Sequence, residues 1–260
     1  MAKFLLAIDI GNTHTVAGLY AGNELVEHWR VATGPHATCD QLAVAFSSLL
    51  VLRGDRLKDV GQMVVSSVVP PLVGQYEELA RRYLGTEALV VGPGTKTGLP
   101  IHTNNPHEVG ADRIVNAVAA LEILGGPCIV VDFGTATTFC AISKGGEYLG
   151  GAIAPGVEVS LEALTARAAR LSRVELGEPG GVIGKTTADS LCSGMVFGFA
   201  GLVDGIVERM RRELGGEGVP MLATGGFADL VVPSSRTLDR IDPLLTLKGL
   251  KLVHERNEKA

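Results

Sequence analysis

The stretch that decides the fold is residues 8–15, which read Ile-Asp-Ile-Gly-Asn-Thr-His-Thr. A related stretch, Val-Asp-Phe-Gly-Thr-Ala-Thr-Thr, occupies residues 131–138, at an offset of 123 positions and without a gap. Both stretches complete short apolar runs, residues 4–8 and 128–131, that are typical of buried strands. The repetition predicts a duplicated unit. Each half combines predicted strands with helices, so we expect an α/β fold built from two halves.

Each copy places an aspartate at the end of a strand and follows it with a glycine and several small hydroxylated residues. The amides and hydroxyls of such a turn can hold phosphate, while the carboxylate handles a cation. A single copy would favour an ordinary hairpin, in which Asp9 and Thr13 bond only their own turn. Two copies at matched register favour a two-sided phosphate site.

Other nucleotide-binding signatures are missing from the sequence. No Gly-x-x-x-x-Gly-Lys-Ser/Thr motif follows a strand, and the fragment Gly-Lys-Thr-Thr at residues 184–187 lacks the first glycine of that motif. Neither loop carries Gly-x-Gly-x-x-Gly, which argues against a dinucleotide-binding fold.

Three helices are predicted away from these loops. One covers residues 41–52 behind the polar Thr38 and Asp40 and stops at Gly54, with a cap at each end. A second opens at residues 155–156 and runs to about Ala169. A closing helix covers residues 242–253, and the charged end at residues 254–260 is expected to fray.

The composition is that of a globular protein, with 260 residues, 46% of them hydrophobic and 20% charged. A net charge of -5 argues against a nucleic-acid partner. The four cysteines stand far apart, so neither a zinc site nor a disulfide framework is indicated. No run approaches the roughly 18 apolar residues of a membrane span. We therefore expect a cytoplasmic protein that binds neither nucleic acid nor membrane.

A second candidate site lies at residues 107–113, His-Glu-Val-Gly-Ala-Asp-Arg. The apolar run that follows predicts a helix beginning near Gly110, with Asp112 and Arg113 in its first turn. An aspartate there is commonly a helix-dipole residue. Adjacent helical residues point about 100° apart, however, so the pair could also grip two parts of one ligand. Asp112 would then accept an alcohol proton while Arg113 pairs with an anion.

A helix predicted at residues 188–214 carries Gly194, Gly198, Gly201 and Gly205 on one face. Each glycine inside a helix costs roughly 0.5–1 kcal/mol relative to alanine. A close backbone approach must offset this cost. The partner is either the sheet of the same domain, which we favour slightly, or the same helix in a second subunit.

Six short motifs occur in a fixed order along nearly the whole chain. They are Asp-Ile-Gly-Asn-Thr at 9–13, Asn-Pro at 105–106, Glu-Val-Gly-Ala-Asp-Arg at 108–113, Asp-Phe-Gly-Thr-Ala-Thr at 132–137, Ser-Gly at 193–194 and Thr-Gly-Gly at 224–226. Together they resemble the type III pantothenate kinases, a family of the superfamily that includes actin, sugar kinases and heat-shock ATPases. The resemblance implies two ribonuclease-H-like domains, residues 1–124 and 125–260, with the nucleotide in the cleft between them.

The resemblance also implies ATP-dependent phosphorylation of pantothenate to 4′-phosphopantothenate, the first step of coenzyme A biosynthesis. By this resemblance, ATP with Mg²⁺ would contact both loops, through Asp9, Ile10, Gly11, Asn12, Thr13, His14, Thr15, Val16 and Thr135. Pantothenate would contact Gly110, Ala111, Asp112, Arg113 and Thr187, with Asp112 as the proton acceptor. Asp132 would bind a monovalent cation, K⁺ or NH₄⁺, and the protein would form a homodimer.

The sequence departs from the family at Thr103, where many members carry an aromatic residue, so the wall of the pantothenate pocket is expected to differ. The alternative to a kinase is a non-kinase actin-like ATPase or regulator of the same fold. Such a protein would have no need of Asp112 and Arg113, and this chain has both.

Overall fold

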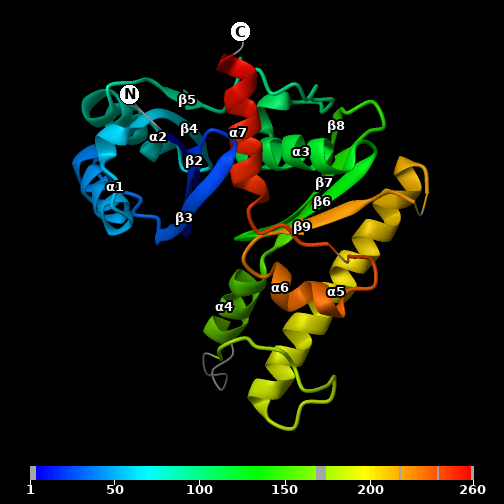
Figure 1. Cartoon of the computed structure of the whole chain (residues 1–260). Coiled ribbons are helices and arrows are strands. Elements are labelled where there is room, and N and C mark those ends of the chain that lie inside the picture. Colours follow the sequence, from blue (N-terminus) through cyan, green and yellow to red (C-terminus); the bar gives the residue numbers. More distant parts are fainter. Residues whose placement is uncertain (1–3, 168–173, 217, 239, 259–260) are drawn as a thin grey trace. The chain divides into compact units, whose positions relative to one another are not determined.

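The computed structural model describes residues 4–167, 174–216, 218–238 and 240–258. The chain forms two compact units, each with its own sheet (Figure 1). The first unit comprises residues 1–98, 105–119 and 246–260, and the second comprises residues 99–104 and 120–245. A division between residues 124 and 125 stays a prediction.

The first unit contains a five-stranded sheet in the order β3-β2-β1-β4-β5. The strands are β1 (Phe4–Ile10), β2 (His14–Ala21), β3 (Glu24–Ala32), β4 (Val60–Ser67) and β5 (Ala88–Val90). The first three strands form an antiparallel meander, whereas β4 runs parallel to β1 and β5 runs parallel to β4. The carboxyl ends of β1 and β4 therefore lie side by side at one edge of this sheet.

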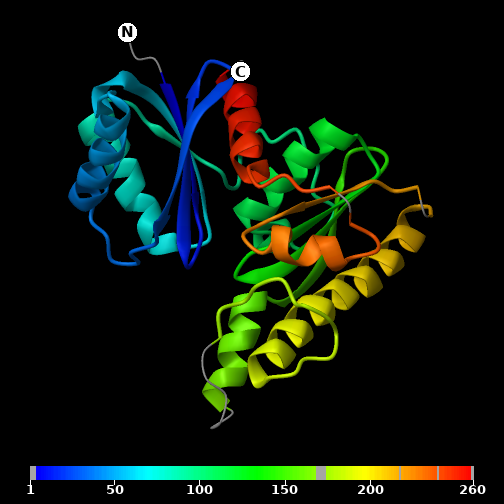
Figure 2. The ribbon, with the colours of Figure 1, turned by 60° about the horizontal axis from the view of Figure 1, so that its bottom comes forward.

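Helices cover both faces of this sheet (Figure 2). One face carries α1 (Cys39–Arg53) and α2 (Pro70–Leu79), the latter continued by a π-helical turn at Ala80–Leu84. Thr38 and Gln41 form a capping box at the start of α1, and Gly54 ends it in the left-handed conformation, as the sequence predicts. The other face receives α7 (Leu245–Glu258), so close that a Cβ on Gly18 would lie 2.8 Å from a methyl group of Leu247.

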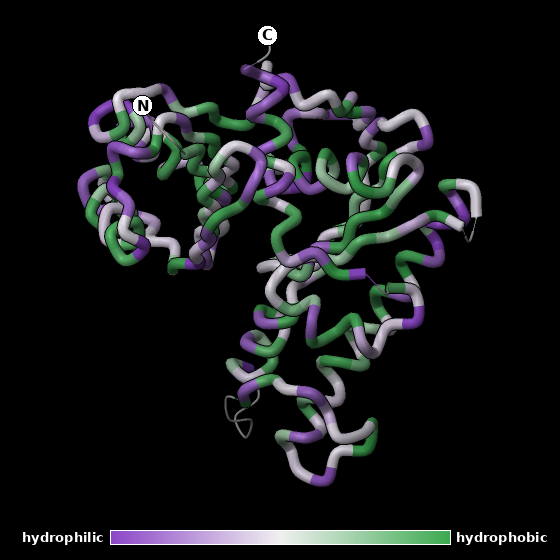
Figure 3. The backbone as a smooth tube through the Cα atoms, in the orientation of Figure 1, coloured by the Kyte–Doolittle hydropathy of each residue, from purple (hydrophilic) through white to green (hydrophobic). Residues whose placement is uncertain are grey.

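The second unit repeats this plan with a four-stranded sheet in the order β8-β7-β6-β9. Its strands are β6 (Cys128–Phe133), β7 (Ala136–Ile142), β8 (Tyr148–Pro155) and β9 (Met221–Thr224). β6 pairs antiparallel with β7 and parallel with β9, just as β1 pairs with β2 and β4. The matching topology confirms the predicted duplication, and the strands at the two centres are hydrophobic over most of their length (Figure 3).

The helices of the second unit are α4 (Val157–Arg167), α5 (Thr187–Leu214) and the short α6 (Ala228–Val231). The remaining helix, α3 (Ala111–Leu124), begins in the first unit and ends in the second. The predicted extension of α4 to Ala169 lies partly outside the described residues. α5 starts one residue earlier than predicted because Thr186 and Asp189 form a capping box there.

The glycine face of α5 does not pack as we favoured from the sequence. A Cβ built on Gly194, Gly198 or Gly201 would meet no atom of the described chain within 4 Å, while one on Gly205 would reach only the Arg209 side chain, at 3.3 Å. The sheet of the same unit is therefore the wrong partner for this face. By length and composition α5 could also cross a membrane, which our sequence analysis did not anticipate, although a core helix passes the same test.

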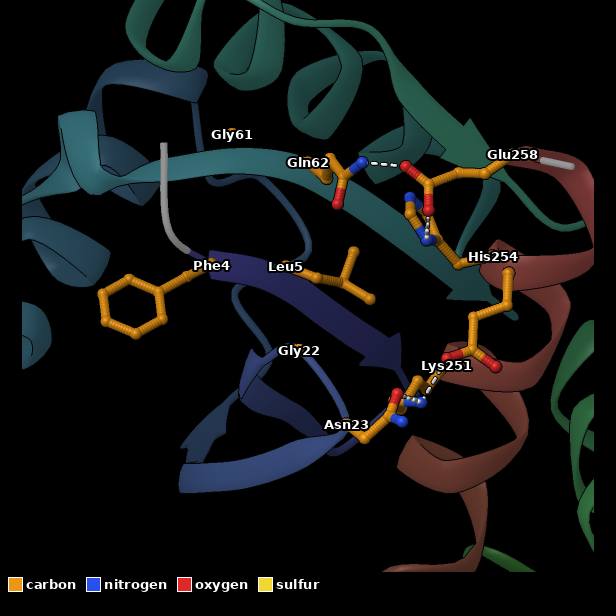
Figure 4. A pocket seen from close by; sticks show the side chains of 10 residues that line it. Phe4, Leu5, Gly22, Asn23, Gly61, Gln62, Lys251, His254 and Glu258 are labelled. Atoms are coloured by element: carbon orange, nitrogen blue, oxygen red, sulfur yellow. Dashed lines mark hydrogen bonds and ion pairs between the residues drawn. The ribbon is translucent and has the colours of Figure 1, made fainter. Parts of the chain in front are cut away.

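The closing helix was also predicted wrongly at its end. We expected the chain from His254 onward to fray, whereas α7 stays helical to Glu258. Glu258 accepts a hydrogen bond from Gln62 and lies 3.7 Å from the ring of His254, which is itself buried (Figure 4). These contacts anchor α7 at the amino-terminal ends of β1 and β4, around a pocket of about 460 Å³.

Candidate active site

Hydrogen bonds hold the turn between β1 and β2 in a single conformation. The amide of Gly11 donates to the carbonyl of His14 at 3.0 Å, and a Cβ on Gly11 would lie 2.8 Å from that oxygen. Thr33 donates its hydroxyl to the Gly11 carbonyl at 2.8 Å and its amide to the Thr13 carbonyl at 2.9 Å. Asn12 and Thr13 stay exposed at the tip. The result is a preformed polar turn that can face an anion.

Asp9 stands one residue before the end of β1, opposite Ser66 of β4. The hydroxyl of Ser66 donates to Oδ1 of Asp9 at 2.5 Å. Part of the Asp9 residue is exposed, but its carboxyl group is enclosed. This burial raises the pKa of Asp9 to about 7; the Ser66 hydrogen bond opposes the shift, and the charge of Asp112 adds to it. A cation at Asp9 would remove the cost of ionising it.

Asp112 lies in the first turn of α3, as predicted. Its Oδ1 is enclosed and has no hydrogen-bond partner within the described part of the chain. Burial raises the pKa of this carboxyl group, while the amide and the charge of Arg113 oppose the shift. Gly110 makes this orientation possible, because a Cβ there would lie 2.4 Å from Oδ1.

This geometry bears on the two interpretations of Asp112. A helix-dipole residue bonds the amides of its own first turn, and Asp112 does so in part. An enclosed oxygen without a donor is costly, however, unless a ligand supplies the missing hydrogen bond. The structure therefore brings Asp9 and Asp112 into electrostatic contact within the first unit and leaves one oxygen suited to a hydroxyl group.

The turn between β6 and β7 has its own support. The amide of Gly134 donates to the Ala136 carbonyl at 3.1 Å, and the amide of Gly156 donates to the Thr135 carbonyl at the same distance. A Cβ on Gly156 would lie 2.3 Å from that carbonyl oxygen, so only glycine fits there. Asp132 stands opposite Thr224 of β9.

The remaining sequence-predicted residues fall in different places. Gly110, Ala111 and Arg113 accompany Asp112 at the start of α3, whereas Thr135 and Thr187 belong to the second unit. Thr187 is exposed at the first position of α5.

Three supporting residues escaped our sequence analysis: Ser66, Thr33 and Gly156. Ser66 could have been found as the hydroxyl residue near the end of a strand parallel to β1. Thr33 and Gly156 support their turns through contacts between segments that are distant in sequence. Such contacts cannot be recognised from a local sequence pattern.

The side chains available as ligands determine how a metal ion could be bound. Within the described residues, no three His, Cys, Asp or Glu side chains converge to form a metal site. A magnesium ion binds readily through one or two carboxylates when the phosphates of its substrate supply further oxygens. The enclosed carboxylate of Asp9 beside a polar turn fits that arrangement.

Comparison with solved structures agrees with this fold. The (R)-2-hydroxyglutaryl-CoA dehydratase component A of Acidaminococcus fermentans aligns with a TM-score of 0.56 at 14% identity, over 98% of each chain. The ethanolamine utilization protein EutJ of Carboxydothermus hydrogenoformans aligns with a TM-score of 0.55 at 14% identity, over 96% of this chain and 90% of its own. The duplicated sheets and paired turns define a protein of the actin-like ATPase and sugar kinase fold.

Sequence comparison narrows the class to one family of phosphotransferases. The family model described as type III pantothenate kinase matches residues 5–209. A type III pantothenate kinase of Moorella thermoacetica is 53% identical over 253 residues, covering 97% of this chain and 99% of the relative. The corresponding protein of Streptomyces coelicolor is 52% identical over 260 residues, covering 97% and 98%. The chain belongs to the type III pantothenate kinase family.

Proposed function

We propose that the chain transfers a phosphoryl group from ATP to the hydroxyl of pantothenate, giving 4′-phosphopantothenate for coenzyme A biosynthesis, with Asp112 as the proton acceptor. The observation that carries the assignment is the enclosed Oδ1 of Asp112, which lacks a hydrogen-bond donor in the described chain. Phosphoryl transfer proceeds through a loose transition state, so the carboxylate chiefly orients the alcohol and accepts its proton late.

The first turn is proposed to bind the phosphates of ATP, with Thr135 adding a contact from the second. A magnesium ion, when bound, would neutralise charge that develops on the transferred phosphoryl group. Asp9 would hold that ion together with phosphate oxygens. The supporting observation is the raised pKa of Asp9, because an enclosed carboxylate gains most from a cation.

Pantothenate is proposed to lie against the start of α3. The guanidinium of Arg113 suits the carboxylate of pantothenate, because arginine pairs with carboxylates through two parallel hydrogen bonds. Gly110 and Ala111 would contact the acceptor through the backbone, and Thr187 would contribute its hydroxyl.

A monovalent cation is proposed at Asp132. A triphosphate beside this second carboxylate would be repelled, by roughly 4 kcal/mol for a close pair at intermediate dielectric, and a bound K⁺ or NH₄⁺ would reverse the sign of that interaction.

The protein is proposed to work as a cytoplasmic homodimer with the glycine face of α5 at the interface. The face is open in the described chain at Gly194, Gly198 and Gly201, and α5 is unusually apolar for a helix with an uncovered side. In sedimentation experiments at micromolar concentration the wild type should be a dimer, and Gly198→Leu should dissociate it without unfolding the subunit. A monomeric wild type would overturn this proposal.

The activity is tested by a coupled assay for ADP release with pantothenate, with pantetheine, and without an acceptor. ADP release that requires pantothenate supports the kinase assignment. Equal release without an acceptor would favour the alternative, a non-kinase ATPase or regulator of the same fold.

A further inference from the structure

The pairing of β4 with β1 places the hydroxyl of Ser66 beside the carboxylate of Asp9. Ser66 is fully buried, one residue before the end of β4. The parallel register pairs Ser66 with Asp9 directly, and paired residues of neighbouring strands project from the same face of a sheet. Their hydrogen bond therefore follows from the strand register rather than from a chance rotamer.

The contact between the two side chains is short and specific. The Ser66 hydroxyl donates to Oδ1 of Asp9 at 2.5 Å, within the range of a hydroxyl bonded to a carboxylate. A carboxylate can turn about its terminal torsion with little cost when nothing holds it. The bond to Oδ1 fixes that torsion, so the other oxygen keeps a constant direction.

We propose that Ser66 is a positioning residue, which holds the Asp9 carboxylate so that its second oxygen is presented to the magnesium–nucleotide complex. This inference rests on the proposed function, which assigns that complex to Asp9. Ser66 itself touches neither nucleotide nor metal in this scheme. Its effect passes entirely through the orientation of Asp9.

The neighbouring residue Ser67 provides a matched control. Its hydroxyl donates to the carbonyl of Val69 at 3.2 Å and accepts from the Val69 amide at 3.0 Å, so it serves only the turn into α2. Ser67→Ala therefore removes the same atom from the next residue of the strand end without touching Asp9.

The experiment measures the affinity of the full chain for a non-hydrolysable ATP analogue by calorimetry, at several magnesium concentrations. Ser66→Ala should weaken binding roughly tenfold at saturating magnesium, the effect of one charge-assisted hydrogen bond, and Ser67→Ala should change it less than twofold. Without magnesium, Ser66→Ala and the wild type should bind the analogue alike. Circular dichroism of both variants checks that they fold.

A double-mutant cycle separates positioning from a general structural role. In an Asp9→Asn background, Ser66→Ala should have little further effect, because the group through which it acts is gone. Equal losses in both backgrounds, or an unchanged affinity in Ser66→Ala, would overturn the positioning role alone. A wild type that binds no magnesium–nucleotide would instead overturn the proposed function, and this inference with it.

Discussion

The two hairpins of the molecule, β1–β2 and β6–β7, share one plan and differ in how each holds its aspartate. In both, the aspartate stands one residue before the end of its strand and faces a buried hydroxyl residue on the parallel neighbour, Ser66 or Thr224. Ser66 holds Asp9 by a hydrogen bond. At the second hairpin the backbone comes close to Asp132, because a Cβ on Gly225 would come within 2.5 Å of its Oδ1.

The duplication therefore repeats the position of the carboxylate, while the described contacts of the two carboxylates differ: a serine hydroxyl at Asp9 and a glycine backbone at Asp132. A hydrogen bond fixes one oxygen of Asp9 and lowers its pKa, whereas the close backbone at Gly225 restricts the space beside Asp132. Asp9 also has a second carboxylate, Asp112, within electrostatic reach. The two hairpins are therefore expected to respond differently to matched substitutions.

The largest expected effect is at Asp112, the carboxylate near the first hairpin. Asp112→Asn keeps the shape and removes the charge, so turnover should fall by roughly 10²–10⁴-fold, the usual range for a positioned general base. Nucleotide affinity, measured by calorimetry, should stay near that of the wild type. If the variant loses ATP binding, or keeps turnover within a few-fold, then Asp112 is a helix-dipole residue instead.

The second prediction concerns the pH dependence of stability. The pKa of Asp9 rises from its usual 3.8 to about 7 on folding, so between these values the folded chain binds a proton that the unfolded chain does not. The contribution of Asp9 to the free energy of unfolding is fully present below pH 4. It is lost as pH rises through 7, which lowers the free energy of unfolding by up to roughly 4 kcal/mol. Asp9→Asn should remove that slope.

Urea denaturation at pH 4, 6 and 8, without ligands, measures this slope. The variant should match the wild type at pH 4 and exceed it at pH 8. Parallel curves for the two proteins would show that the Asp9 carboxylate is not enclosed in solution. Asp9→Asn should also weaken magnesium–nucleotide binding, by the loss of the charge that faces the cation.

The third prediction tests the close approach of the Gly225 backbone to Asp132 at the second hairpin. Gly225 has a φ of 93°, and a side chain there would meet both Asp132 and the amide of Phe133 at 2.5 Å. Gly225→Ala should lower the free energy of unfolding by roughly 2–4 kcal/mol, from backbone strain and overpacking together. Gly54→Ala is the matched control, with a φ of 90° but open space, and should cost only about 1–2 kcal/mol. Equal losses would mean that the backbone at Gly225 does not approach Asp132 and Phe133 this closely in solution.

The smallest effect is expected for the proposed monovalent cation. Wild-type turnover should rise several-fold when K⁺ or NH₄⁺ replaces Na⁺, because the cation screens Asp132 from the triphosphate. Asp132→Asn should lose this response. Full turnover in a sodium buffer, with no gain on adding potassium, would remove the cation from the mechanism.

Local patterns predicted much of this molecule and missed what depends on distant contacts. The places of Asp9 and Asp132 near strand ends and of Asp112 in the first turn of a helix were predicted correctly, because the turn chemistry and the apolar runs around them are local. The capping residues of α1 were found for the same reason. Ser66 was missed because its importance comes from strand register. The end of α7 was predicted wrongly because Gln62, far away in sequence, holds Glu258.

The glycine face of α5 shows another limit. Spacing along a helix predicts that four glycines share one side, but it does not say what covers that side. The sheet of the same unit is the simpler partner, but among the described residues no atom lies within 4 Å of a Cβ built on Gly198, so this sheet does not cover that side.

The return of α7 to the first unit has a consequence for synthesis of the protein. This helix supplies Leu247, Leu250 and Val253 to the interior, and a Cβ on Gly249 would lie 2.0 Å from the carbonyl oxygen of Val115 on α3. The ribosome makes α7 only after the whole second unit. Until α7 has been synthesised, the sheet of the nascent first unit lacks one of the helices that cover it. The helix that carries Asp112, α3, then also lacks its contact with α7. A chain interrupted before that point would expose apolar surface to chaperones and proteases rather than act as a partial enzyme.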